Sequence, residues 1–95
     1  MSAITGRPTA GARLVVEKTE EAPDVVVYRG LVYLPDGEVP AEITVALPGG
    51  ATRATLGQGG NPVMEKETAA LVRAATKAQV AAGEALSRKI VRWRP

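Results

Sequence analysis

The sequence contains no cysteine, no histidine and no phenylalanine. The absence of cysteine excludes disulfide bonds and thiolate chemistry, and it leaves the redox compartment open. The absence of histidine removes the most common general base and the most common transition-metal ligand. Aromatic residues are scarce, since Tyr28, Tyr33 and Trp93 are the whole set. We therefore expect one small domain with a shallow core built from alanine and aliphatic side chains.

A catalytic function is not expected from the residues that remain. The two serines, Ser2 and Ser87, have no base at a useful spacing. Acidic residues gather at 17–24 and 36–42, but without the spacing of a calcium loop. The Gly57–Gly60 loop precedes a helix start, as a phosphate-binding loop does, yet it lacks the P-loop lysine. We predict solvated loops here, with no catalytic residue, cofactor, metal or small-molecule substrate.

Charge is divided unevenly along the chain, although the net charge is only +2. Residues 1–60 carry five basic and seven acidic side chains, and residues 61–95 carry seven basic and three acidic ones. A basic end of this kind can bind an anion, or it can complement a helix dipole and keep the protein soluble. The basic residues at this end, with no acid among them, are Arg88, Lys89, Arg92 and Arg94.

No targeting pattern is visible in the sequence. Residues 1–11 lack the apolar run of a signal peptide, and no stretch approaches the length of a membrane span. We therefore expect a cytoplasmic protein that does not act at a membrane.

The first part of the chain predicts a β-meander behind a flexible arm. Residues 1–11 are small, polar and interrupted by glycine and proline, so we expect no regular structure there. The segment 24–34 is apolar on both faces, which predicts a central strand or one whose outer face meets something else. Gly30 within it indicates a bulge or a bend. The predicted strands of the domain, which covers 12–95, are 12–18, 24–34, 41–47 and 52–56.

The second part predicts one long helix over 62–92. Asn61 and Pro62 suit an N-cap and the first helical position, and no proline follows until the last residue. The predicted fold is α+β, an antiparallel four-stranded meander followed by one long C-terminal helix packed on one face. Its core should place Leu14, Val16, Ile43, Val45, Leu47 and Leu56 against Leu71, Ala75 and Ala78.

The predicted helix is longer than the domain beneath it. Thirty residues would span about 45 Å, whereas a domain of this size is about 30 Å across. Either the helix breaks, with Gly83 as its weakest position, or its end projects. A projecting end would expose Leu86, Ile90 and Trp93, which we predict as partner-binding anchors. Trp93 could alternatively fold back as a lid on the sheet.

Two functional hypotheses follow from these features. The first is a non-catalytic interaction or assembly protein, an accessory or adaptor subunit in a phage or a bacterial multi-protein machine. Its partner would be another protein or a second copy of the chain. The alternative is a nucleic-acid-binding module that uses Arg53 and the basic segment 88–94. The element order resembles that of single-stranded-DNA-binding transcriptional coactivators and whirly proteins in topology. We rank this alternative second because the basic charge is small for phosphate neutralisation.

Overall fold

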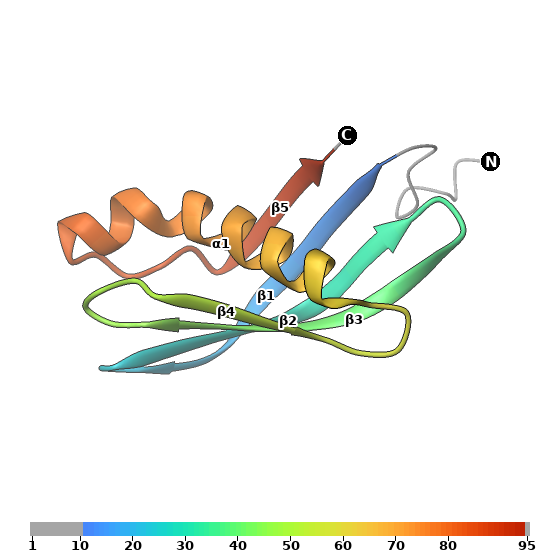
Figure 1. Ribbon diagram of the computed structural model, residues 1–95. Helices are drawn as coiled ribbons and strands as arrows, with labels where there is room; N and C mark the ends of the chain where they lie inside the picture. Colours follow the sequence, from blue (N-terminus) through green and yellow to red (C-terminus); the bar gives the residue numbers. More distant parts are fainter. Residues whose placement is uncertain (1–10, 95) are drawn as a thin grey trace.

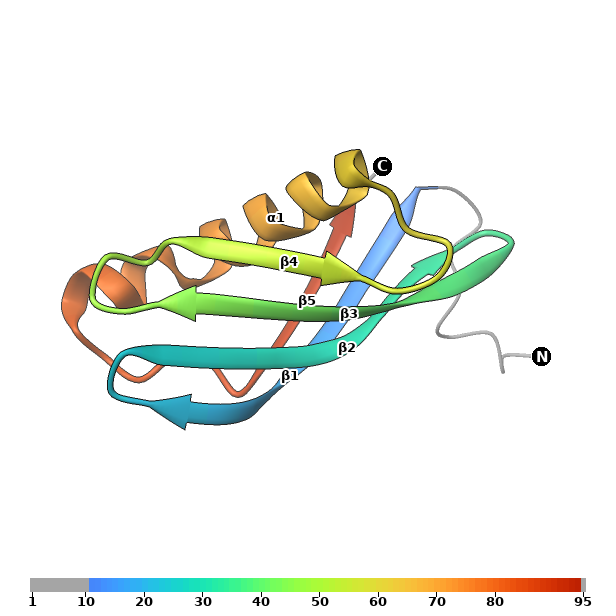
Figure 2. The same ribbon diagram turned by 60° about the horizontal axis from the view of Figure 1, so that its bottom comes forward.

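The computed structural model describes residues 11–94, which form five strands and one helix in two layers (Figure 1). The strands make one antiparallel sheet in the order β4-β3-β2-β1-β5. Helix α1 covers one face of this sheet, so the fold is α+β, as the sequence predicts (Figures 1 and 2). The elements are β1 (Ala12–Ala22), β2 (Val25–Leu34), β3 (Gly37–Ala46), β4 (Thr52–Leu56), α1 (Pro62–Ala82) and β5 (Lys89–Arg94).

We call the sheet face under α1 the inner face and the opposite one the outer face. The predicted arm over residues 1–11 lies outside the described residues, apart from Gly11. The four predicted strands are present, and a fifth strand, β5, follows the helix and pairs with β1. The prediction of a four-stranded sheet with a C-terminal helix is therefore only partly correct.

The helix ends ten residues earlier than predicted, at Ala82. Gly83 adopts a left-handed conformation with φ of 69°, which only glycine tolerates readily. The Gly83 N–H donates to the carbonyl oxygen of Val80 at 3.2 Å, and the Glu84 N–H donates to that of Gln79 at 2.9 Å. These bonds close the last turn, so the helix breaks at Gly83 and no helical end projects.

The strand β1 continues through the acidic segment that the sequence assigned to a loop. Its pairing with β2 shifts between Lys18 and Glu20, which places the bulge in β1 rather than at the predicted position, Gly30. Gly30 pairs regularly, and a Cβ atom there would lie 2.0 Å from the Val15 carbonyl oxygen. The glycine therefore allows β1 and β2 to approach closely.

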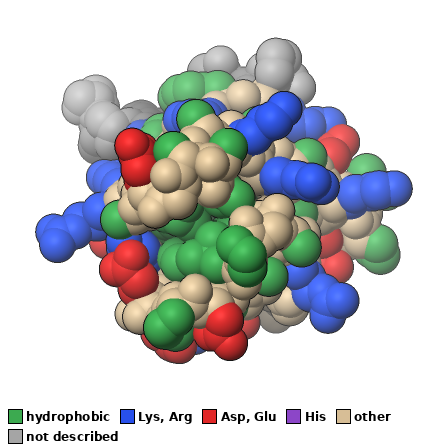
Figure 3. Space-filling model, turned by 90° about the vertical axis from the view of Figure 1, so that its left-hand side faces the viewer, with side chains coloured by type: hydrophobic (Ala, Val, Ile, Leu, Met, Phe, Trp, Pro, Cys, Tyr) green, Lys and Arg blue, Asp and Glu red, His purple; other side chains and the backbone are tan. Residues whose placement is uncertain are grey.

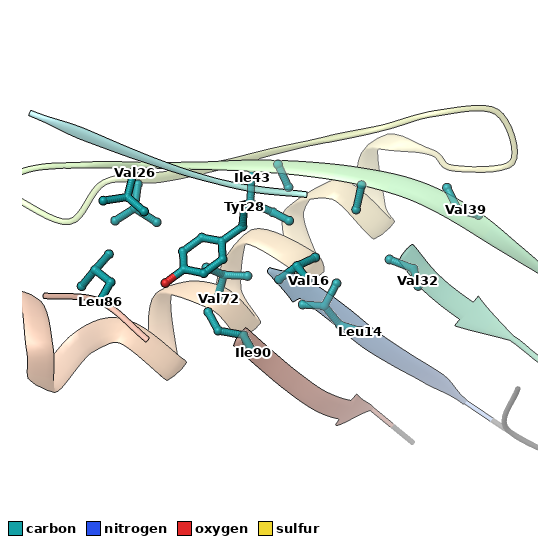
Figure 4. Close-up of a cluster of buried hydrophobic side chains, with 13 residues drawn as sticks. Leu14, Val16, Val26, Tyr28, Val32, Val39, Ile43, Val72, Leu86 and Ile90 are labelled. Carbon is teal, nitrogen blue, oxygen red and sulfur yellow. The ribbon is translucent and has the colours of Figure 1, made fainter. Parts of the chain in front are cut away.

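The core lies between the inner face and α1 (Figure 4). Leu14, Val16, Ile43 and Val45 are buried as predicted, whereas Leu47 and Leu56 are only half-buried. On the helix the predicted core residues Leu71 and Ala75 are wrong by one position, because the buried residues are Thr68, Val72 and Thr76. Leu71 and Ala75 are half-buried and Ala78 is exposed. The helix is thus rotated by about one residue relative to the prediction, which buries Thr76. Its buried hydroxyl is satisfied because it donates to the Val72 carbonyl at 2.9 Å.

The connection from α1 to β5 is fixed by buried polar contacts. The hydroxyl of Tyr28, whose side chain is fully buried, donates to the carbonyl oxygen of Ser87 at 2.5 Å. Burial raises the pKa of this hydroxyl to about 12, and the Glu21 carboxylate adds to the shift. Gln79 bonds both the backbone N–H and the hydroxyl of Ser87, at 3.0 and 2.9 Å. These contacts hold Leu86 in the core beside Tyr28 (Figure 4).

Candidate interaction surface

The outer face carries a row of aromatic and basic side chains across three neighbouring strands. Trp93 of β5 lies opposite Arg13 of β1, and Arg13 lies opposite Tyr33 of β2. The Arg13 guanidinium carbon is 5.4 Å from the Trp93 ring centre and 5.9 Å from the Tyr33 ring centre. Both distances are within the range of cation–π attraction. Trp93 is 60% exposed, which is unusual for so large an apolar side chain.

A second row on the outer face is aliphatic. Val15 of β1 pairs with Leu31 of β2 on one side and with Val91 of β5 on the other. All three side chains are half-buried. Because they lie two residues along each strand from the aromatic row, the two rows are adjacent. We call the six residues together the outer patch: Arg13, Val15, Leu31, Tyr33, Val91 and Trp93.

The next row along the outer face is charged, with signs that alternate from strand to strand. Lys89, Glu17, Arg29 and Glu42 lie side by side on β5, β1, β2 and β3. Arg29 donates to the Glu42 carboxylate at 2.8 Å and to the Glu20 carboxylate at 3.2 Å. These hydrogen bonds, led by that to Glu42, raise the pKa of Arg29. The centre of the outer face is therefore neutralised within the chain.

The basic residues predicted to bind nucleic acid do not form one cluster. Arg53 lies on β4, at the opposite edge of the sheet from β5. Lys89 lies on the outer face of β5, whereas Arg92 and Arg94 lie on its inner-face side, opposite Leu14 and Ala12. Arg94 also forms an ion pair with Glu67 of α1 at 2.5 Å. Arg88 is exposed and directly precedes β5.

The structure corrects two of the three predicted partner-binding anchors. Leu86 is 4% exposed and Ile90 is 3% exposed, and both belong to the core. They are buried because the chain reverses at Gly83 and returns to the sheet as β5. Trp93 remains exposed, on an edge strand rather than on a projecting helix or a lid.

Sequence reasoning missed five residues of the outer patch. A signal existed for Leu31 and Tyr33, because the segment 24–34 is apolar on both faces and only one face can lie under the helix. Arg13, Val15 and Val91 join the patch only through the pairing of β1 with β5. The prediction of a helix over residues 83–92 excludes a strand there and therefore excludes this pairing.

Polar contacts fix the start of α1 on both sides of the glycine-rich segment 57–60. Among residues 11–94, no group of three or more possible metal-ligating side chains comes together. The side chain of Asn61 accepts from the Met64 N–H at 2.9 Å, which confirms the predicted N-cap. Glu65 accepts the N–H of Leu56 at 3.0 Å, so the start of the helix is fastened to β4.

One end of the molecule carries a hollow with hydrophobic side chains at its base and charged ones around it (Figure 3). At this end a groove separates the β3–β4 turn from α1, and Pro48, Ala74, Lys77 and Val80 help to line it. None of the candidate residues predicted from the sequence lies in this groove. Its lining combines mostly small residues with Arg73 and Lys77, and this combination does not specify a ligand.

Comparisons with protein-family models, with curated proteins and with solved structures found no match for this chain. Within the described residues, α1 is the only helix, and it lacks the apolar length required to cross a bilayer. The candidate surface must therefore be interpreted from its own chemistry.

Proposed function

We propose that the protein is a non-catalytic interaction subunit that binds a protein partner through the outer patch. The observation that carries this proposal is the exposure of Trp93, at 60%, beside Tyr33 and Arg13 on a sheet face that no described element covers. Tryptophan, tyrosine and arginine are the residues that most often dominate binding energy in protein interfaces.

The surroundings of the outer patch support the same proposal. The aliphatic row of Val15, Leu31 and Val91 extends the apolar area beside Trp93. The charged row next to it, in which Arg29 is already paired with Glu42, provides a polar border. An apolar centre with a polar rim is the usual arrangement of a protein interface.

Replacement of Trp93 by alanine tests this proposal, and Val63→Ala is the matched control. Val63 is similarly exposed, at 66%, but lies at the start of α1, away from the outer face. A partner is first captured by photo-crosslinking from residue 31 and then purified for titration. We expect Trp93→Ala to weaken its binding by about 30-fold or more, as for a loss of about 2 kcal/mol. Equal affinity of the two variants would refute the proposal.

Nucleic-acid binding is a second candidate function, favoured by one specific observation. The exposed Trp93 ring of β5 and the Arg13 guanidinium lie on the same sheet face as the basic side chain of Lys89. Such a surface can stack on an unpaired base and contact phosphates. If it does, replacing Lys89, which lies on the same face as Trp93, by glutamine should reduce the slope of log affinity against log salt by about 0.7, as for one lost contact with a single strand. Absence of oligonucleotide binding by the wild type at low salt would exclude this function.

A further inference from the structure

The two edges of the sheet differ in how their outward backbone groups are covered. At β4, the Gly57 N–H donates to the Pro40 carbonyl at 2.9 Å, so the alternate residues, including Leu56, direct their backbone groups away from β3. α1 packs along this strand, and the Glu65 carboxylate accepts the Leu56 N–H (Figure 2). The β4 edge is therefore occupied by the chain itself.

The β5 edge is open by the same criterion. The Lys18 N–H donates to the Arg88 carbonyl at 2.7 Å, so even-numbered residues of this segment bond to β1 and odd-numbered residues direct their backbone groups outward. A contact at the edge agrees with this orientation, because Arg92 donates from its guanidinium to the Val91 carbonyl at 2.9 Å. No other element among residues 11–94 pairs with β5 on this side.

The side chains of β5 define what could pair with it. Arg92 and Arg94 lie on the inner-face side, whereas Val91 and Trp93 lie on the outer face. Every charged residue in 88–94 is basic. Antiparallel pairing with β5 of a second copy would place like charges together, which is unfavourable. A strand with acidic side chains on the inner-face side and apolar ones on the outer face would complement both sides of β5.

We propose that the β5 edge binds an extended segment of a partner protein in which acidic and apolar residues alternate, so that this segment adds a sixth strand to the sheet. The proposal rests on the proposed function and specifies the chemistry of the partner. Backbone hydrogen bonds to residues 89, 91 and 93 supply affinity, and the charge of Arg92 selects acidic segments, whereas Arg94 is already paired with Glu67. The apolar residues of the segment extend the outer patch beside Trp93.

The test uses a fluorescent peptide of about nine residues with alternating glutamate and valine, titrated against the full chain by anisotropy. In an antiparallel pair, residues that exchange hydrogen bonds lie directly opposite each other and share a face. The valines should therefore bond to β5, and the glutamates should direct their N–H groups to solvent. We expect N-methylation of the valines to weaken binding about tenfold or more, and N-methylation of the glutamates to have little effect. A peptide with lysine in place of glutamate should not bind.

A substitution in the protein provides the second measurement. Val91→Pro removes an outward N–H but none of the bonds to β1, because the Val91 N–H points away from β1. Proline is tolerated at such a position of an edge strand. Val91→Thr is the control that keeps the N–H. We expect the proline variant to bind the peptide about tenfold or more weakly than Val91→Thr, since the comparison of the two variants isolates the N–H.

Several outcomes would overturn the inference. Equal binding of the lysine peptide, or no effect of N-methylation at the valines, would exclude the proposed pairing. Tighter binding of a thymidine oligonucleotide than of the peptide would favour nucleic acid as the ligand. A dimer in light scattering that Val91→Pro dissociates would favour a second copy. If no peptide binds but Trp93→Ala still abolishes association with a purified protein partner, the inference fails and the proposed function stands.

Discussion

Replacing Ile90 by alanine tests whether β5 is an integral part of the fold. Ile90 is 3% exposed and lies in the core cluster with Leu14, Tyr28 and Val72 (Figure 4). The substitution removes three carbon atoms, which corresponds to about 2.4 kcal/mol of transfer free energy at about 0.8 kcal/mol each. The cavity left behind raises the expected loss of stability to about 2–5 kcal/mol. A domain of this size has about 5 kcal/mol in total, so the loss would be severe.

The assay is urea unfolding followed by circular dichroism. We expect the midpoint for Ile90→Ala to fall sharply with an unchanged m-value. Trp93→Ala is the control, because it removes a larger side chain from the same strand but an exposed one, and its cost should stay below about 1 kcal/mol. If Ile90→Ala unfolds at the wild-type midpoint, Ile90 is not a core residue. Residues 89–94 would then not contribute to the core, as the prediction of a projecting segment requires.

Two further substitutions test other parts of the fold. Gly30→Ala should cost about 1–3 kcal/mol, because its Cβ would meet the Val15 carbonyl oxygen at 2.0 Å; Gly37→Ala, which meets nothing within 4 Å, should leave the melting temperature nearly unchanged. Tyr28→Phe should cost about 1–2 kcal/mol, since the Ser87 carbonyl loses its donor. Burial raises the pKa of Tyr28 from 10.0 to about 12, so the folded state holds this proton more tightly. The protonated hydroxyl therefore contributes to the free energy of unfolding in full below pH 10, and this contribution is lost as the pH rises towards 12. In urea melts, Tyr28→Phe should lack this part of the pH dependence.

The meander was predictable from the sequence because its signals are local. Alternation of apolar and polar residues in 41–47 fixes the face of β3, and the segment Pro35–Gly37 fits the turn before it. The N-cap at Asn61 was predictable for the same reason, since one side chain and one backbone N–H define it.

The fifth strand was not predictable in this way. Residues 84–94 contain no proline, and Leu86 and Ile90 continue the helical spacing of apolar residues, so periodicity favoured one long helix. The helix ends before Gly83, which adopts a left-handed conformation. This conformation turns the chain back towards the sheet, and it is stabilised only if the following residues can pair with a strand there. That place is the open edge of β1, and an edge is a property of the assembled sheet. The error in the candidate anchors, Leu86 and Ile90, follows directly from this.

The pairing of β1 with β5 joins the two ends of the described chain, with Ala12 opposite Arg94. Every other strand pair connects consecutive elements through a short turn and can form locally, whereas this one must close a loop that contains nearly the whole domain. Until it closes, β1 has an unpaired edge and the inner face lacks Ile90. We therefore expect completion of the sheet to be a late, slow step of folding. A circular permutant that links residues 12 and 94 and opens at Gly57–Gly60 would make this pairing a hairpin and should fold faster.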